Sequence, residues 1–308
     1  MREHPRRPPI LRATATDPAG TRALQRRHAA GAVVRLLPGV FIATEVWAGL
    51  TPAEQHLARA RAVAPHLRPG SVFSHGTAAM IHGWPWIGAT GDRVHVLDPA
   101  AAVIQHRVGV IRHPGGPRTT PDHVAFDGVP VTSMLETAVT IATTIEQHVA
   151  AVAVDAAVRA GDLLIDEIRS AAPRRPARGS VRAAAVLDAL DPLHESVGES
   201  FAAARFVQLG LPRCTSQARV RHHDGTVDRV DFWFPSLGVV VEFDGRQKYV
   251  DPSMLQGRDP GDVLWAEKRR EDRIRALPAV RTVIRVTWWH LVELDRLRAL
   301  FRAHGVRV

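Results

Sequence analysis

The stretch VDRVDFWFPSLGVVVEFDG, residues 227–245, holds two apolar runs on either side of the turn sequence PSLG. Alternation of apolar and polar residues with a period of two is typical of β-strands. A hairpin that closes with Phe234 opposite Val239 places six apolar residues on one face: Val230, Phe232, Phe234, Val239, Val241 and Phe243. A slip of one residue would expose this set, so the pattern strongly specifies the register.

The same register places two carboxylates, Asp231 and Glu242, directly opposite each other on the other face. Facing like charges destabilise a sheet by up to about 1 kcal/mol, so the pattern favours a cation between them. Mg²⁺ suits this position because it binds through one or two carboxylates, waters and substrate phosphates. The alternative is that both carboxylates face solvent on an outer sheet surface, although Trp233 and Val240 on that face argue against full exposure.

Helices are predicted on both sides of the hairpin. The preceding stretch DPLHESVGESFAAARFVQLGLP, residues 191–212, forms an amphipathic pattern with Glu195 and Glu199 on one face. The following stretch DVLWAEKRREDRIRAL, residues 262–277, has opposite charges four residues apart, which indicates a salt-bridged surface. Arg269 and Arg273 are helical neighbours there, and phosphate contact by this pair is the alternative interpretation.

The stretch VIRVTW, residues 283–288, predicts a buried strand near the end of the chain. Trp288 and Trp289 at its end are candidates for stacking on an unpaired base, and core packing is the alternative for at least one of them.

The successive blocks VDFWF, EFDGRQKY, EKRREDRIRAL and VIRVTWWHL resemble an uncharacterised family related to the very-short-patch-repair endonucleases, within the PD-(D/E)xK nucleases. The resemblance spans about residues 192–304. It implies a restriction-endonuclease-like mixed sheet flanked by helices, with the acidic pair on the central strands. It also implies Mg²⁺- or Mn²⁺-dependent cleavage of DNA by metal-bound water.

The nuclease resemblance assigns roles to individual residues. Asp231 and Glu242 would hold the metal, Glu199 would approach it from the first helix, and the backbone carbonyl of Phe243 would complete the site. The chain departs from the motif at position 244, where aspartate replaces the expected lysine. The resemblance implies that Lys248, four residues later, supplies the positive charge beside the scissile phosphate.

A basic helix and a hairpin are predicted near the N-terminus. TRALQRRHAAG, residues 21–31, reads as a helix, and AVVRLLPGVFIA, residues 32–43, as a hairpin around Pro38-Gly39. This is the second half of a winged helix-turn-helix, whose first helix is interrupted by Asp17-Pro18 and Gly20. Candidate DNA contacts on the basic helix are Arg22, Arg26 and Arg27.

Further elements follow this hairpin. A capping box at Thr51 and Glu54 begins a helix, SHGTAAMIHG predicts a second helix, and DRVHVLDP and GVIRHP predict strands. His75 and His82 lie seven residues apart on one helical face. Because no third ligand accompanies them, buried or capping histidines are favoured over a metal pair.

The succession RLLPGVFIA, SHGTAAMIHGWP, DRVHVLDP, DGVPVTSMLETAVTIA and AVDAAVRAG resembles the AbiEi-like antitoxins of type IV toxin–antitoxin systems. The resemblance covers roughly residues 20–165. It implies that an N-terminal winged helix binds promoter DNA and that the following domain contacts a partner such as a toxin.

The composition bounds the class of protein. The chain has 308 residues, of which 45% are hydrophobic and 23% charged, so extensive disorder is excluded and about two domains are expected. The single cysteine, Cys214, excludes a disulfide framework and fits a reducing cytosol. No signal peptide or membrane span is evident, so we expect a cytoplasmic protein without membrane contact.

Charge and breaker residues suggest the domain boundaries. The net charge is +9, and the first 35 residues hold eight arginines against two acidic residues, which favours a nucleic-acid partner. We expect a loose basic tail (1–20), an α+β antitoxin-like regulatory domain (21–168), an Arg/Pro-rich linker with a short helix (169–191) and a nuclease-like domain (192–308). The chain as a whole is therefore predicted to be α/β.

Two functions follow from these patterns. The first is Mg²⁺-dependent endonuclease or nickase activity, with DNA binding or regulation by the N-terminal region. The second is a non-cleaving DNA-binding regulator or antitoxin that uses the nuclease fold as a scaffold. The carboxylate pair favours the first, whereas the displaced lysine and the antitoxin-like half favour the second.

Overall fold

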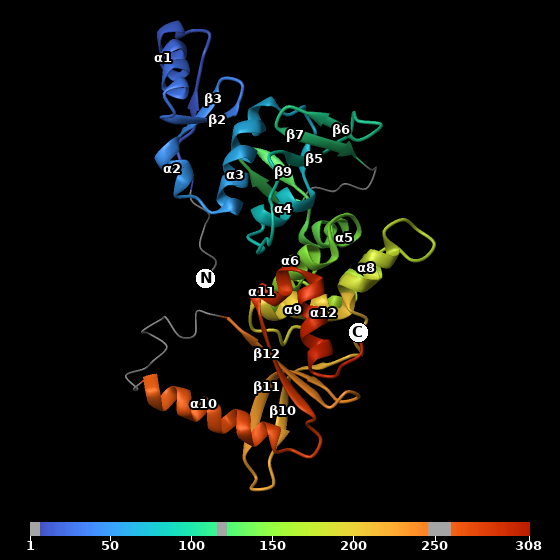
Figure 1. Ribbon diagram of the computed structural model, residues 1–308. Helices are drawn as coiled ribbons and strands as arrows, with labels where there is room; N and C mark the ends of the chain where they lie inside the picture. Colours follow the sequence, from blue (N-terminus) through green and yellow to red (C-terminus); the bar gives the residue numbers. More distant parts are fainter. Residues whose placement is uncertain (1–6, 116–121, 246–259) are drawn as a thin grey trace.

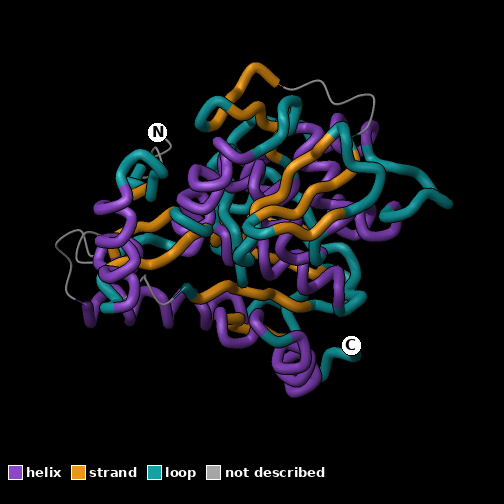
Figure 2. The backbone as a smooth tube through the Cα atoms, turned by 90° about the horizontal axis from the view of Figure 1, so that it is seen from above, coloured by secondary structure: helices purple, strands orange, loops and turns teal. Residues whose placement is uncertain are grey.

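The α/β architecture expected from the sequence is present in the computed structural model, which describes residues 7–115, 122–245 and 260–308. The described residues form three sheets, with helices between and around them (Figures 1 and 2). None of the described helices combines the length and the apolar character needed to cross a membrane.

The N-terminal unit is a small sheet in the order β1-β3-β2 with one helix beside it. Its elements are β1 (Leu11–Arg12), α1 (Pro18–Ala29), β2 (Val33–Leu37) and β3 (Val40–Ala43). The Asp17 carboxylate accepts a hydrogen bond from the amide of Gly20 at 2.9 Å, and Pro18 occupies the first turn. Asp17-Pro18 therefore begins α1 instead of interrupting a helix, and residues 7–20 are not the loose tail that we expected.

The next unit is a mixed six-stranded sheet in the order β6-β7-β5-β4-β9-β8. Its strands are β4 (Val72–Phe73), β5 (Val94–Asp98), β6 (Gln105–Arg107), β7 (Val110–Pro114), β8 (Asp122–Phe126) and β9 (Val129–Val131). Its helices are α2 (Thr44–Ala48), α3 (Pro52–Val63), η1 (Ala64–His66) and α4 (His75–Ile81). The predicted capping box of α3 is confirmed, because Thr51 and Glu54 exchange hydrogen bonds.

A helical layer lies between this sheet and the C-terminal sheet (Figure 1). It consists of α5 (Met134–Thr144), α6 (Gln147–Arg159), α7 (Ile165–Ala171) and α8 (Ser180–Leu187). Ile168, Ala183 and Val186 are buried in one apolar cluster, which also contains Ala204 from the C-terminal part. The segment 169–191, predicted to be an Arg/Pro-rich linker with a short helix, contains α8, which packs into this core through Ala183 and Val186.

The C-terminal sheet has the order β10-β11-β12-β13. Its elements are α9 (Val197–Gln208), β10 (Thr215–Arg221), β11 (Val227–Phe234), β12 (Val239–Asp244), α10 (Pro260–Arg275), β13 (Thr282–Thr287), α11 (Trp288–Val292) and α12 (Leu294–Ala303). The first three strands are antiparallel, and β13 runs parallel to β12 after the α10 crossover. The predicted hairpin register is confirmed, with Phe234 opposite Val239 and Phe232 opposite Val241.

Both faces of this sheet are buried. Phe232, Phe234, Val241 and residues of α9 and α12 form one cluster. The other face packs against α10 through Val240, Ile274 and Val283. Val230, predicted to share the face of Phe232, belongs to the second cluster, because the regular β11–β12 pairing ends at Phe232.

Candidate functional site

The acidic pair lies where the ladder between the two central strands ends. Asp231 is on β11 and Glu242 is on β12, each next to the last pair of the ladder, Phe232 and Val241, so the direct pairing predicted for the two acids is not part of this ladder. The amide of Phe243 donates a hydrogen bond to the Asp231 carboxylate at 2.8 Å. The Asp231 side chain thus satisfies a backbone donor at the place where the strands separate.

Arg270 of α10 binds the Glu242 carboxylate through both of its terminal nitrogens. The two N···O distances are 2.8 and 3.2 Å, and the same guanidinium donates to the backbone carbonyl of Arg229. Burial alone would lower the pKa of Arg270, but Glu242, Asp228 and Asp231 raise it above its ordinary value. A protein cation therefore lies beside the carboxylates for which the sequence predicted a metal ion.

The helix α10 also shields the acidic pair from solvent. The Glu242 side chain is 16% exposed, so the alternative of an outer, solvent-facing surface is wrong. The salt-bridged character predicted for α10 is confirmed by Glu271, which binds Arg275 at 2.6 Å and Arg285 at 2.7 Å. These two arginines hold the pKa of Glu271 below its ordinary range, against the effect of its burial.

Glu199 accepts hydrogen bonds at the start of α9 instead of contributing to the acidic pair. Gly198 permits close contact of this helix with β12, because a Cβ atom there would lie 2.1 Å from the Phe243 ring. The buried Glu199 carboxylate accepts hydrogen bonds from the Ser196 hydroxyl at 2.7 Å, the Glu195 amide at 2.9 Å and the Gln217 side chain at 2.7 Å. Its acceptor capacity is largely used by its own neighbourhood.

In the described part of the chain, Glu199 does not form a common group of potential metal ligands with Asp231 and Glu242, whereas three histidines elsewhere do form such a group. Phe243, whose carbonyl was expected to complete the site, pairs with Val286 in the parallel ladder. Lys248 lies outside the described residues.

Two predicted DNA contacts on α10 differ in their surroundings. Arg273 binds Asp228 at 3.1 Å, whereas Arg269 is exposed and forms no ion pair with a described residue. At the end of β13, Trp288 contacts the rings of Phe201 and Phe243 but is 39% exposed, so it lies at the border of the core rather than inside it. Trp289 is 60% exposed and lies against the Arg296 guanidinium.

The basic helix α1 stands on the surface. None of its twelve residues is buried, and all of them are described. Arg22, Arg26 and Arg27 are exposed, and none of the three pairs with an acidic group in the described part of the chain. Arg35 on the adjacent strand β2 is also exposed. Helix and hairpin therefore present an uncompensated positive surface.

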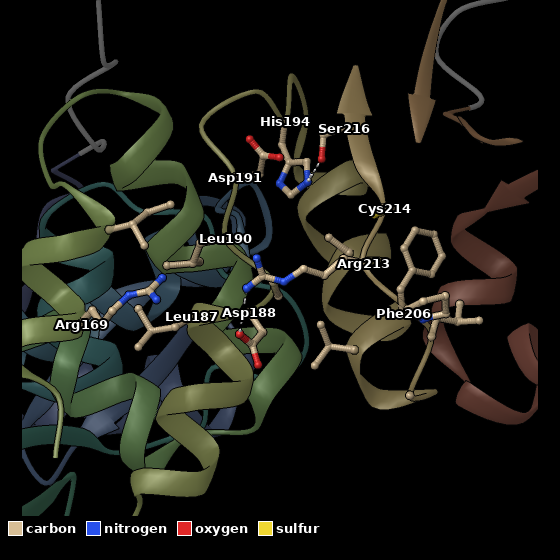
Figure 3. Close-up of a pocket in the computed structure, with 17 residues that line it drawn as sticks. Arg169, Leu187, Asp188, Leu190, Asp191, His194, Phe206, Arg213, Cys214 and Ser216 are labelled. Carbon is tan, nitrogen blue, oxygen red and sulfur yellow. Dashed lines mark hydrogen bonds and ion pairs between the residues drawn. The ribbon is translucent and has the colours of Figure 1, made fainter. Parts of the chain in front are cut away.

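A pocket of about 400 Å³ lies between α8, α9 and β10 (Figure 3). On its wall His194 contacts the Ser216 hydroxyl at 3.2 Å and the Asp155 carboxylate at 3.0 Å. The order of groups resembles that in serine hydrolases, but a nucleophile must reach its substrate, and Ser216 is buried and paired with Phe232 in the sheet. We assign a structural role to the hydrogen-bonded series Asp155–His194–Ser216, because it joins α6, β10 and the loop before α9.

Three histidines meet on one face of the six-stranded sheet. His75 begins α4, His95 lies on β5 and His113 lies on β7. His82, which the sequence grouped with His75, instead contacts the Thr132 carbonyl at 2.8 Å and is buried, as favoured. Sequence reasoning missed the partners of His75 because they come from two strands whose pairing is not a local pattern.

Comparison with known proteins gives relatives without a stated activity. No protein-family model and no solved structure matches this chain. Two uncharacterized proteins of Mycobacterium tuberculosis, MT2308 of strain CDC 1551 / Oshkosh and Rv2248 of strain ATCC 25618 / H37Rv, are each 29% identical to it over 226 residues. The similarity covers 72% of this chain and 80% of each relative. The nuclease and antitoxin resemblances therefore remain predictions from the sequence.

Proposed function

We propose that the protein binds DNA through α1 and the hairpin β2–β3. The observation that carries this proposal is the exposure of Arg22, Arg26 and Arg27 on a helix with no fully buried residue. Ala23 and Leu24 are only partly buried, so most of the helix surface is available to a partner. Arginines without carboxylate partners favour a polyanion, and phosphate contacts supply sequence-independent affinity for DNA.

Gel-shift titration of duplex DNA over a range of salt concentrations tests this proposal. Arg22→Ala/Arg26→Ala should weaken binding and flatten the dependence of affinity on salt, by about 0.9 in slope for each lost phosphate contact. Arg307→Ala is the matched control, because Arg307 is exposed near the C-terminus and has no ion pair with a described residue. An unchanged salt slope in the double variant would exclude α1 as the contact surface.

Mg²⁺-dependent DNA cleavage by the C-terminal domain is the second candidate function. It is favoured by the position of Asp231 and Glu242 on the two central strands of a mixed sheet flanked by helices, the arrangement that the nuclease resemblance implies. These two residues would hold the metal, which would supply the activated water. Glu242 must first leave Arg270, so the contacts support DNA binding more strongly than cleavage.

A plasmid-nicking assay separates the two candidates. Supercoiled DNA is incubated with the full chain in Mg²⁺ or in EDTA. Cleavage at the acidic pair predicts nicking in Mg²⁺ that Glu242→Gln abolishes and that Glu293→Gln, a change at an exposed acid of the same domain, leaves intact. If the wild type binds DNA but does not nick it, the result favours the interpretation in which the nuclease-like fold is only a scaffold.

A further inference from the structure

The three histidines on the face of the six-stranded sheet are close enough to share one ligand. One nitrogen from each of His75, His95 and His113 lies within 4.8 Å of the others. His95 Nδ1 and His113 Nε2 are 2.9 Å apart, and the His75 ring stacks on the His113 ring with centroids 3.8 Å apart. Three imidazoles from three separate elements thus converge without an acidic residue in the group.

The three side chains are of the residue type that most commonly binds metals in proteins. His75 is buried, and His95 and His113 are partly buried. A neutral imidazole binds a transition metal through the lone pair of one ring nitrogen.

Backbone and side-chain contacts orient the cluster. His75 has φ of 52°, a left-handed conformation that is costly for a residue with a side chain. The Ser74 hydroxyl lies 3.0 Å from His75 Nδ1, so Nε2 is the ring nitrogen that could bind a metal once the ring turns. A partner on the second ring nitrogen is typical of metal-bound histidines in proteins.

We propose that His75, His95 and His113 bind a divalent transition metal, Zn²⁺ in the first place, through three imidazole nitrogens. In a tetrahedral site with Zn–N bonds of about 2.0–2.1 Å, two ligand nitrogens lie about 3.3 Å apart. His95 Nδ1 and His113 Nε2 are 2.9 Å apart as a hydrogen-bonded pair, so a metal would replace the proton that they share and separate them by about 0.4 Å. Coordination requires the His75 ring to turn out of its stack on His113, because stacked rings direct their nitrogens in parallel.

All three histidines line a cavity of about 1220 Å³, which would receive the fourth ligand of the metal. Its lining also includes exposed arginines from the segment that the sequence marked as a linker: Arg175, Arg178 and Arg182. A metal site with three protein ligands and an open position is of the reactive type. Because arginines line the same cavity, we infer that the fourth ligand is an anion of the phosphate class.

Calorimetric titration of the metal-stripped full chain with Zn²⁺ tests the site. The wild type should bind one equivalent, and His113→Ala should bind at least about 100-fold more weakly, since changes in the supporting shell alone cost 10–100-fold. His223→Ala is the matched control, because His223 is exposed and lies outside the cluster. Equal affinity in the wild type and in His113→Ala, or no stoichiometric binding by the wild type, would overturn the proposal.

Cobalt spectroscopy keeps the test independent of the stability of the alanine variant. Co²⁺ bound to the wild type should show the intense visible absorption of a four-coordinate site. His113→Cys keeps a ligand at this position and should add a sulfur-to-metal band. A six-coordinate spectrum in the wild type, or no new band in the cysteine variant, would contradict the assigned ligands.

Inorganic phosphate probes the open position. Its addition to the Co²⁺-loaded wild type should alter the visible spectrum, and Arg178→Ala should require a higher phosphate concentration for the same change. Arg307→Ala should behave as the wild type. A spectrum insensitive to phosphate would overturn the assignment of an anion to the fourth position.

Discussion

At the scale of single residues, Arg270 determines the electrostatics of the acidic pair. Its guanidinium contacts Glu242 through both terminal nitrogens and lies 4.0 Å from Asp228. Both partners of the Arg270–Glu242 pair are partly buried, with side chains 27% and 16% exposed. Removal of one partner from such a pair costs more than formation of the pair contributes, because the remaining charge is left without compensation.

The first prediction concerns this pair. In EDTA, Arg270→Gln should lower the free energy of unfolding by about 2 kcal/mol, less than the loss of about 3–5 kcal/mol for a fully buried pair. Mg²⁺ should then raise the melting temperature of the variant more than that of the wild type, because the Glu242 carboxylate beside Asp231 no longer binds the Arg270 guanidinium. Denaturant titration and calorimetry measure the two effects.

Arg275→Gln is the control for this prediction. Arg275 lies on the same helix but binds Glu271, away from the acidic pair. The same response to Mg²⁺ in both variants would show that the metal does not bind between Asp231 and Glu242.

The sequence predicted part of this site for a definite reason. A period of two fixes which side chains share a face, so the pairing of Phe232 with Val241 and of Phe234 with Val239, next to the acidic pair, followed from the apolar pattern alone. The contact with Arg270 did not follow, because it depends on how α10 packs on the sheet through Ile274. The partners of His75 were hidden for the same reason, since strand order is a tertiary property.

At the scale of secondary-structure elements, the Asp155–His194–Ser216 chain joins three segments. Asp155 is fully buried on α6 and accepts hydrogen bonds from the Ser200 hydroxyl and from the Asp191 amide at 2.8 Å. His194 extends this network to β10 through Ser216. The carboxylate therefore stabilises the junction of α6, α9 and β10.

The second prediction follows from this junction. His194→Ala should lower the free energy of unfolding by about 2–3 kcal/mol, because a buried carboxylate and a buried hydroxyl each lose a partner. His223→Ala, at an exposed histidine, should change it by less than about 0.5 kcal/mol. Urea denaturation of the two variants is the measurement, and equal midpoints would contradict the role assigned to the network.

Element boundaries show where local sequence signals suffice. The Thr51–Glu54 capping box was read correctly because all its partners lie within one turn. Asp17-Pro18 was read as a break because the same two residues favour turns and helix starts alike. The hydrogen bond from the Gly20 amide to Asp17 distinguishes the two in the folded chain.

At the scale of the whole molecule, buried histidines make stability depend on pH. Burial, aided by the nearby Arg59 guanidinium, lowers the pKa of His56 from 6.5 to about 4. Its Nε2 lies 2.8 Å from the Thr77 hydroxyl. The unfolded chain binds a proton at this residue more readily than the folded chain does. The contribution of the neutral, buried His56 to the free energy of unfolding is therefore fully present above about pH 6.5 and falls as the pH decreases toward 4.

The third prediction measures this dependence. Between about pH 6.5 and 4, His56 should contribute up to about 1.4 kcal/mol of lost stability for each pH unit. His56→Gln should be less stable at neutral pH and should lose less on acidification, whereas His66→Gln, at an exposed histidine, should follow the wild type. Identical acid profiles for His56→Gln and the wild type would contradict the prediction.

The packing between α6 and α9 has a consequence for long ligands. Val152 of α6 lies in the core of the C-terminal sheet, while Ala204 of α9 lies in the core of the helical layer. Because each core includes a side chain from the other, the helical layer and the C-terminal sheet cannot slide or rotate freely against each other. If one duplex contacts both α1 and the end of β12, the distance between these two contacts along the DNA would therefore be fixed. Lengthening the DNA between the two contacts by about 5 base pairs, half a helical turn, would turn one contact to the far side of the duplex.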